Sequence, residues 1–122
     1  MFTKKQLEKA LKSIVIPTVT TNSIWFDVIY YDSKNKRHKH SVRFDKRKDV
    51  SIKEKFTCDC SWWTHKVQFN RGQLCYHIIA AIIKMAELKW IDKYWLAYIF
   101  DLDPAELKDN FSKKDLRTYL YK

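Results

Sequence analysis

The segment FTCDCSWWTHKVQFNRGQLCYHIIAAII, residues 56–83, holds all three cysteines of this 122-residue chain. Its first close pair is Cys58 with Cys60, and its second is Cys75 with His77. Two close pairs of thiolate and imidazole groups are the usual ligand supply of a tetrahedral zinc site. An odd number of cysteines in so short a window is a poor disulfide framework. The spacing therefore predicts metal binding in a reducing compartment.

The two pairs need different local structures to reach one ion. Cys58 and Cys60 are two residues apart, so both thiols point to the same side of an extended segment. On a regular helix the same spacing would separate Cys75 and His77 by about 200° around the axis, so we expect Cys75 to precede the first helical turn. Gly72, the only glycine, lies where the chain would bend back towards the ion. The segment is predicted as a strand, a loop and a helix.

The residues alone leave the fourth ligand open, because His65 lies in the loop between the two pairs. Asp59, which separates two thiols on an extended segment, is expected to point away from the ion. A redox dithiol at Cys58 and Cys60 is the less favoured alternative. Three thiolates and one imidazole leave no open position for water, and no serine, histidine and acid grouping stands out. The site is therefore predicted to be structural, in a protein that is not an enzyme.

This segment resembles the SWIM-type zinc finger, whose pattern is C-x-C, a variable spacer, and C-x-H running into an apolar helix. The resemblance implies that His77 rather than His65 is the fourth ligand, so that one structural zinc is held by Cys58, Cys60, Cys75 and His77. SWIM modules occur in transposases, in chromatin-remodelling ATPases and in small partners of RecA-family recombinase paralogues, where DNA or protein binding is the proposed role. The short chain is most similar to the last group.

The positive charge of the chain is concentrated in one stretch. The formal net charge is +10, from 24 Lys and Arg against 14 Asp and Glu. Residues 34–55 alone contain ten of these cations and three of the acids. Such a concentration indicates a surface for a polyanion, and a solvated lysine-rich hairpin is the alternative. An anionic membrane surface is less favoured, because the chain has no evident basic amphipathic helix.

Periodicity around the cysteine segment predicts an α+β fold with a small antiparallel sheet of about three strands. A capping box of Thr3 and Gln6 begins an N-terminal helix that ends near residue 13. Alternating apolar residues predict strands over 24–31 and 40–44, joined by a turn at 32–36. In the third strand, which leads into Cys58 and Cys60, the alternating apolar residues fall on the same face as these two cysteines.

The C-terminal part is predicted to be helical. A broad apolar face follows Cys75, and the aromatic residues over 90–98 suggest a further amphipathic helix that packs into a core. Asp103 and Ser112 are expected to cap short closing helices. We expect a single domain over 1–122, made of a helix and basic hairpin over 3–49, the finger over about 50–87 and helices over 90–121.

Side chains alternate between the two faces along a strand, so if Val42 faces the core, the cations at the alternate positions face outward. In the loop, Trp62 is expected to cover the metal, while Trp63 faces outward to stack on a base. The residues predicted to contact nucleic acid are Lys39, Arg43, Lys53, Lys55, Trp63, Lys66 and Arg71. The sequence thus favours a nucleic-acid-binding protein, to which the resemblance adds an accessory role in recombination or repair. The alternative is an adaptor whose aromatic C-terminal helices dock a RecA-family ATPase or another protein.

Several classes of protein are disfavoured by what the chain lacks. Its longest uninterrupted aliphatic run, residues 78–83, is too short to cross a bilayer, and its N-terminus is charged. We therefore expect no membrane span and no signal peptide, and a cytoplasmic location, or a nuclear one in a eukaryote. A single glycine cannot build a glycine-rich phosphate loop. Nucleotide hydrolysis and a small-molecule substrate are not expected.

Overall fold

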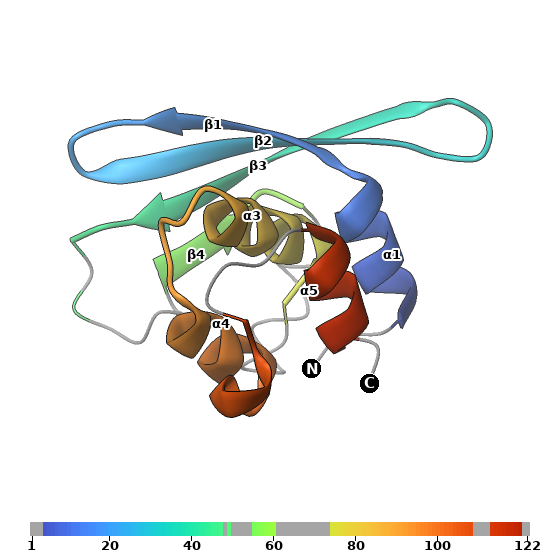
Figure 1. The fold of residues 1–122 in the computed structure, drawn as a ribbon. Helices are drawn as coiled ribbons and strands as arrows, with labels where there is room; N and C mark the ends of the chain where they lie inside the picture. Colours follow the sequence, from blue (N-terminus) through green and yellow to red (C-terminus); the bar gives the residue numbers. More distant parts are fainter. Residues whose placement is uncertain (1–3, 48, 50–54, 61–73, 109–112, 121–122) are drawn as a thin grey trace. The chain divides into compact units, whose positions relative to one another are not determined.

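In the part of the chain that the structure describes, the sheet is an antiparallel meander of four strands in the order β1-β2-β3-β4 (Figure 1). A computed structural model describes residues 4–47, 49, 55–60, 74–108 and 113–120. The elements are α1 (Lys4–Lys12), β1 (Ile14–Val19), β2 (Ser23–Tyr31), β3 (Arg37–Asp45), β4 (Phe56–Cys58), α3 (Tyr76–Glu87), α4 (Lys93–Phe100), the short 3-10 helix η2 (Pro104–Glu106) and α5 (Lys113–Leu120). The predicted α+β class, with helices on both sides of the finger in the sequence, is confirmed.

β1 is a fourth strand, where the sequence predicts about three. It pairs with β2 and places Pro17 opposite Phe26. Because β1 lies at the edge of the sheet, one of its sides makes no ladder hydrogen bonds, and proline is tolerated there. The run IVIPTV therefore forms a strand in spite of its proline.

The two faces of the sheet differ because side chains alternate along each strand. On β2 and β3 the even-numbered residues form the inner face, where Phe26, Val28 and Val42 are fully buried. The register places Phe26 opposite Val42 and Val28 opposite His40. The alternation predicted for these two strands is confirmed.

Two helices contact the inner face of the sheet (Figure 1). α1 is amphipathic and buries Leu7 and Ala10, which are three residues apart and so share one side of the helix. The Nζ atom of Lys9 in α1 lies 5.8 Å from the centre of the Tyr30 ring on β2. Tyr76, at the start of α3, meets the same ring edge-on at 5.9 Å. Tyr30 thus joins both helices to one end of the sheet.

The turn between β2 and β3 is built around one carboxylate. Asp32 accepts hydrogen bonds from the backbone N–H groups of Lys34 and Lys36, each at 2.9 Å. Its other oxygen lies 2.9 Å from Nε2 of His38, and this contact is the main cause that lowers the pKa of Asp32. Asn35 adopts the left-handed conformation, with φ 60°, which asparagine tolerates well. The predicted turn at 32–36 is confirmed.

The chain forms two compact units, residues 1–81 and 82–122, with the boundary inside α3. The predicted apolar face of α3 is confirmed, because Ile78, Ile79, Ile82, Ile83 and Ala86 are all buried. The single domain over 1–122 stays a prediction. No described helix is long and apolar enough to cross a membrane.

Capping residues set the helix boundaries in the second unit. Asp92 caps α4 and accepts a hydrogen bond from the Trp95 backbone N–H at 3.0 Å. Asp103 accepts from Ala105 N–H at 3.0 Å and begins η2, so the cap predicted there is confirmed, although the helix it begins is a single 3-10 turn. The cap predicted at Ser112 lies outside the described residues.

The aromatic residues near α4 do not pack as the sequence predicts. Their apolar neighbours Ile91, Leu96, Ile99 and Phe100 are the buried ones. Four large aromatic side chains are exposed instead, namely Trp90, Tyr94, Trp95 and Tyr98. The expectation that they fill a core is wrong, because aliphatic residues and Phe100 supply the buried side of this helix.

Two adjacent aromatic residues test the register of β2. Phe26→Ala should lower the free energy of unfolding by about 3–5 kcal/mol, because it removes a fully buried ring. Trp25→Ala should cost no more than about 1 kcal/mol, because its side chain is exposed and its ring forms a cation–π pair with Arg43. Chemical denaturation in buffer containing zinc measures both values. Equal losses would contradict the assignment of the two faces.

Candidate metal centre

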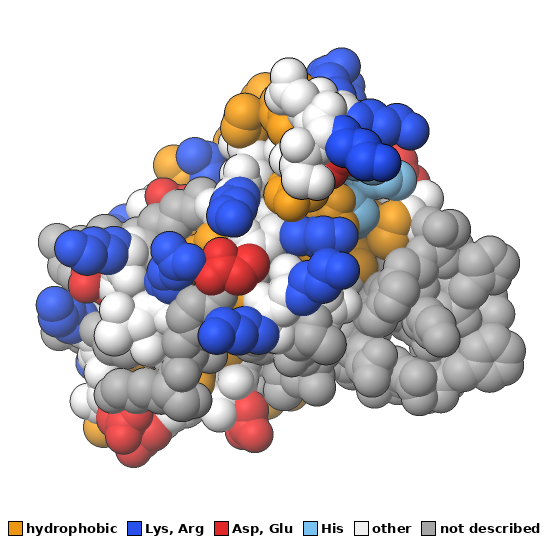
Figure 2. Space-filling model, turned by 90° about the vertical axis from the view of Figure 1, so that its right-hand side faces the viewer, with side chains coloured by type: hydrophobic (Ala, Val, Ile, Leu, Met, Phe, Trp, Pro, Cys, Tyr) orange, Lys and Arg blue, Asp and Glu red, His pale blue; other side chains and the backbone are white. Residues whose placement is uncertain are grey.

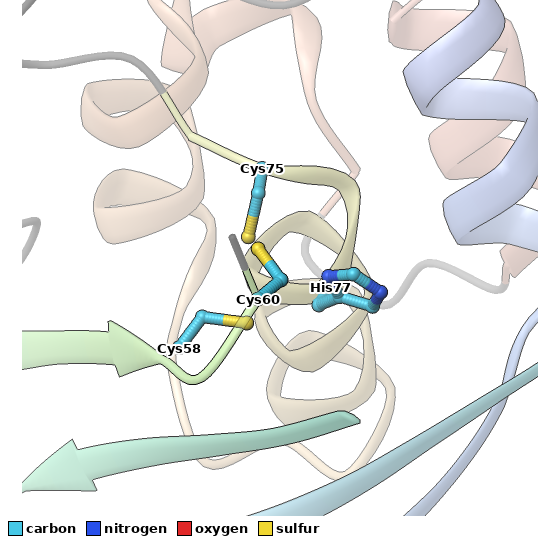
Figure 3. A group of neighbouring side chains, drawn as sticks. All are labelled: Cys58, Cys60, Cys75 and His77. Atoms are coloured by element: carbon cyan, nitrogen blue, oxygen red, sulfur yellow. The ribbon is translucent and has the colours of Figure 1, made fainter. Parts of the chain in front are cut away.

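Four potential metal ligands come together from two segments of the chain (Figure 3). Cys58 is the last residue of β4, and Cys60 follows it at the spacing that keeps both thiols on one side. Cys75 immediately precedes α3, and its carbonyl accepts a hydrogen bond from the Ile79 N–H at 3.1 Å, so Cys75 is at the N-cap position of the helix. His77 lies in the first turn of α3. The predicted arrangement, with Cys75 ahead of the helix, is confirmed.

The geometry suits a small tetrahedral ion. All four residues are buried, and their ligand atoms lie within 4.8 Å of one another. In a zinc site with Zn–S bonds of about 2.3 Å, two sulfurs are about 3.8 Å apart, so each edge has to contract by at most about 1 Å. Figure 3 shows the three sulfur atoms turned towards a common region, with the imidazole of His77 beside them.

His77 provides the clearest sign that a metal belongs here. Its side chain is buried, yet neither Nδ1 nor Nε2 has a hydrogen-bond partner among the described residues. An unsatisfied buried polar atom costs about 1–3 kcal/mol. A bond from one ring nitrogen to a metal removes that cost at this atom, which explains why a histidine is kept in an apolar helix.

Burial and crowding make the thiols reluctant to ionise on their own. The hydrogen bond with Cys60 is the largest cause that raises the pKa of Cys58, to about 12. Burial is the main cause that raises the pKa of Cys75 far above its ordinary value. Metals bind thiolates, so a cation has to supply the free energy of deprotonation. Three sulfur donors and one imidazole fit zinc, and the residues therefore form a site for one structural zinc ion.

The sheet supports the site through a contact that the sequence analysis missed. The His40 ring lies 4.3 Å from the His77 ring, centre to centre, and its Nδ1 is 3.0 Å from Oδ1 of Asp59. The Ser41 N–H donates to that same oxygen at 3.1 Å. Asp59 is exposed and points away from the ligands, as predicted. The parity of His40 with Val42 was the available signal, but only the β3–β4 register shows which ligand it approaches.

The residues predicted to contact nucleic acid differ in how they are held. Lys39 is exposed on β3. Arg43 is half-buried, with Nε donating to Ser23 Oγ at 3.0 Å and its guanidinium carbon 5.5 Å from the Trp25 ring centre. Nζ of Lys55 lies 5.9 Å from the ring centre of Phe44, a residue of inner-face parity. The remaining predicted contacts are Lys53, Trp63, Lys66 and Arg71, and they lie outside the described residues. His65 and Trp62 lie outside them as well.

Comparison with known proteins agrees with this site. Residues 44–86 match the family model of the SWIM zinc finger, a stretch that includes all four ligands. No curated protein and no solved structure gave a match. The predicted resemblance of this segment is confirmed, and so is the expectation of one structural zinc.

The metal site predicts a simple pattern of zinc content and stability. Fresh protein should hold one zinc per chain, and His77→Ala should reduce that content and lower the Tm by more than about 10 °C, because metal binding supplies folding free energy. His65→Ala is the control and should change neither value. Elemental analysis and thermal melts measure both. Loss of zinc in His65→Ala with retention in His77→Ala would mean that the ligand set is wrong.

Proposed function

We propose that this chain, whose residues 44–86 carry a SWIM zinc finger, is a non-enzymatic nucleic-acid-binding protein in which zinc serves as a scaffold. The finger is a binding module, and a site with four protein ligands has no position for a reacting water. Binding of nucleic acid or of another protein is the general role that such a module supports. The choice between them depends on the surface.

The observation that carries the proposal is the row of exposed cations on β3 and the turns beside it. The exposed side chains are Lys34, Lys36, Arg37, Lys39, Lys46 and Arg47. Two acids of the same stretch are engaged, since Asp32 pairs with His38 and Asp45 lies 3.7 Å from Arg43. Cations gathered on one hairpin sum to a positive potential that attracts phosphates.

The N-terminal helix adds to this charge. Lys4, Lys5 and Lys12 of α1 are exposed. Figure 2 shows Lys and Arg side chains gathered on the side of the molecule where Figure 1 places α1 and the β2–β3 turn. The sequence did not indicate this contribution, because acids nearby in the chain balance these lysines in any count by segment. We propose that both elements contribute to binding.

We also propose an accessory role in DNA recombination or repair, which the resemblance of the motif supports. Trp63, Lys66, Arg71 and Lys53 lie outside the described residues, and they stay proposed contacts. A cytoplasmic or nuclear location follows from the need to keep the three thiols reduced, and is likewise proposed.

A second candidate function is favoured by the exposed aromatic side chains of α4. Trp95 and Tyr98 contact each other edge-on at 6.3 Å, and the Nζ atom of Lys93 lies 5.5 Å from the Tyr94 ring centre. Exposed aromatic residues on one helix are typical anchors of protein interfaces. An adaptor that docks a RecA-family ATPase or another protein through α4 is therefore the alternative. Its binding would depend little on salt.

Salt dependence separates the two candidates. The variant with Lys36→Gln, Arg37→Gln and Lys39→Gln should bind duplex DNA more weakly, and the slope of log K against log salt should flatten by up to about 0.9 per lost phosphate contact. A control with Lys89→Gln, Lys114→Gln and Arg117→Gln removes the same charge from exposed sites in 82–122 and should leave the slope nearly unchanged. Fluorescence anisotropy across a salt series measures both. Equal slopes in the first variant and the wild type would favour the adaptor.

A further inference from the structure

The outer face of the sheet, opposite α1 and the first turns of α3, has an unusual composition. We define it by the odd-numbered residues of β2 and β3 and by their neighbours on β1, namely Ile14, Ile16, Thr18, Ser23, Trp25, Asp27, Ile29, Tyr31, Arg37, Lys39, Ser41, Arg43 and Asp45. An antiparallel sheet with one solvated face usually carries polar residues there. Here Ile14, Ile16, Trp25 and Tyr31 are 53%, 50%, 43% and 47% exposed. Exposed apolar side chains of this size, grouped on one face, indicate a binding surface.

The aromatic residues of this face are each paired with a cation. The register places Trp25 opposite Arg43 and Tyr31 opposite Arg37, with Ile29 opposite Lys39 between them. β2 therefore presents rings and an aliphatic side chain, while the neighbouring strand β3 presents a parallel row of positive charge. The two acids of the outer face are engaged, because Asp27 lies 3.5 Å from Ser41 Oγ and Asp45 is 3.7 Å from Arg43.

This pattern matches the two parts of a single strand of nucleic acid. Bases stack on aromatic rings irrespective of sequence, while the phosphates run alongside and require cations. Side chains on one face of a strand recur about every 6.6 Å, so Trp25 and Tyr31 are separated by about 20 Å along β2. A duplex keeps the faces of its bases stacked on one another, so it cannot offer them to these rings.

We propose that the outer face binds single-stranded nucleic acid, with bases on Trp25 and Tyr31 and phosphates along Arg37, Lys39 and Arg43. This inference rests on the proposed nucleic-acid function and assigns it a strand preference and a surface. The other conceivable occupant is a second copy of the chain. A symmetric dimer through this face would set the same cations of two copies, each of net charge +10, against one another. Charge therefore favours the polyanion.

Arg43, besides being a proposed phosphate contact, also orients the Trp25 ring. Its Nε donates to Ser23 Oγ at 3.0 Å, and its guanidinium carbon lies 5.5 Å from the Trp25 ring centre. These contacts, with Asp45 at 3.7 Å, hold the guanidinium beside the ring. The ring and the cation are thus fixed next to each other before any ligand binds, which lowers the entropic cost of binding.

The test compares two aromatic pairs of the same chemistry. The probes are labelled oligomers of deoxythymidine and of uridine, about ten nucleotides long, together with a duplex of equal length. Each of Trp25→Ala and Tyr31→Ala should weaken single-strand binding by about 5- to 150-fold and change duplex binding little. Trp95→Ala with Tyr98→Ala, which removes one Trp and one Tyr of similar exposure from α4, should have no effect.

Separate controls test whether each variant is folded and whether an aromatic ring is what the binding requires. Zinc content and thermal melts show whether each variant is folded, and Trp25→Phe should recover most of the single-strand affinity because it restores a ring. Cross-linking of the wild type to an oligomer that contains 5-iodouracil, followed by mass spectrometry, should label the peptide of β2. This readout needs no substitution and so does not depend on a variant that folds.

Each other outcome overturns the inference in a recognisable way. Wild-type binding with unchanged affinity in the Trp25 and Tyr31 variants would leave the proposed function intact and exclude this surface. A wild type that binds neither single strand nor duplex would exclude the proposed function itself. A dimer in sedimentation analysis that Trp25→Ala dissociates would show that a second copy occupies the face.

Discussion

One cation has to hold three buried thiolates and one buried imidazole that come from two separate segments of the chain. Without that charge the thiols resist ionisation, and neither buried nitrogen of His77 has a hydrogen-bond partner in the part of the chain that the structure describes. The metal joins the end of β4 to the start of α3, which are distant in sequence but adjacent in space (Figure 3). The attachment of the first turn of α3 to β4 depends on this junction, because β4 itself is only three residues long.

The sheet contributes to the same junction from its other side. β3 pairs with β4 so that Val42 lies opposite Cys58, and the pairing continues beyond the strand through the Asp59 N–H, which donates to the Ser41 carbonyl at 3.3 Å. His40 then fits between Asp59 and His77. A metal ligand held by a neighbouring ring and by its own helix loses few degrees of freedom on binding. The basic hairpin and the zinc site therefore form one connected structural unit rather than two separate modules.

The spacing of the cysteines indicated a metal site because it is a local property, whereas His77 came from the resemblance to the SWIM finger. Two residues on a strand share a side, and a residue just before a helix differs from one within it; both facts are visible without knowing the fold. The role of His40 depends on a register between strands that are distant in sequence, so no local pattern showed it. The sequence did not predict β1, because a proline such as Pro17 is tolerated in a strand only where that strand lies at the edge of a sheet. Periodicity predicted the helix α4. It did not show which side of the helix is buried, and so it did not show that Trp95 is exposed.

Alternation along the strands links the zinc site to the outer face. On β3, His40 and Val42 point inward towards the finger, while Lys39, Ser41 and Arg43 point outward. A shift of one residue in the β3–β4 pairing would exchange these two sets and bury cations beneath the sheet, at a high cost in desolvation. The ion favours this register, because a shift of one residue would turn Cys58 and Cys60 away from Cys75 and His77. The zinc site and the composition of the outer face therefore depend on the same strand register.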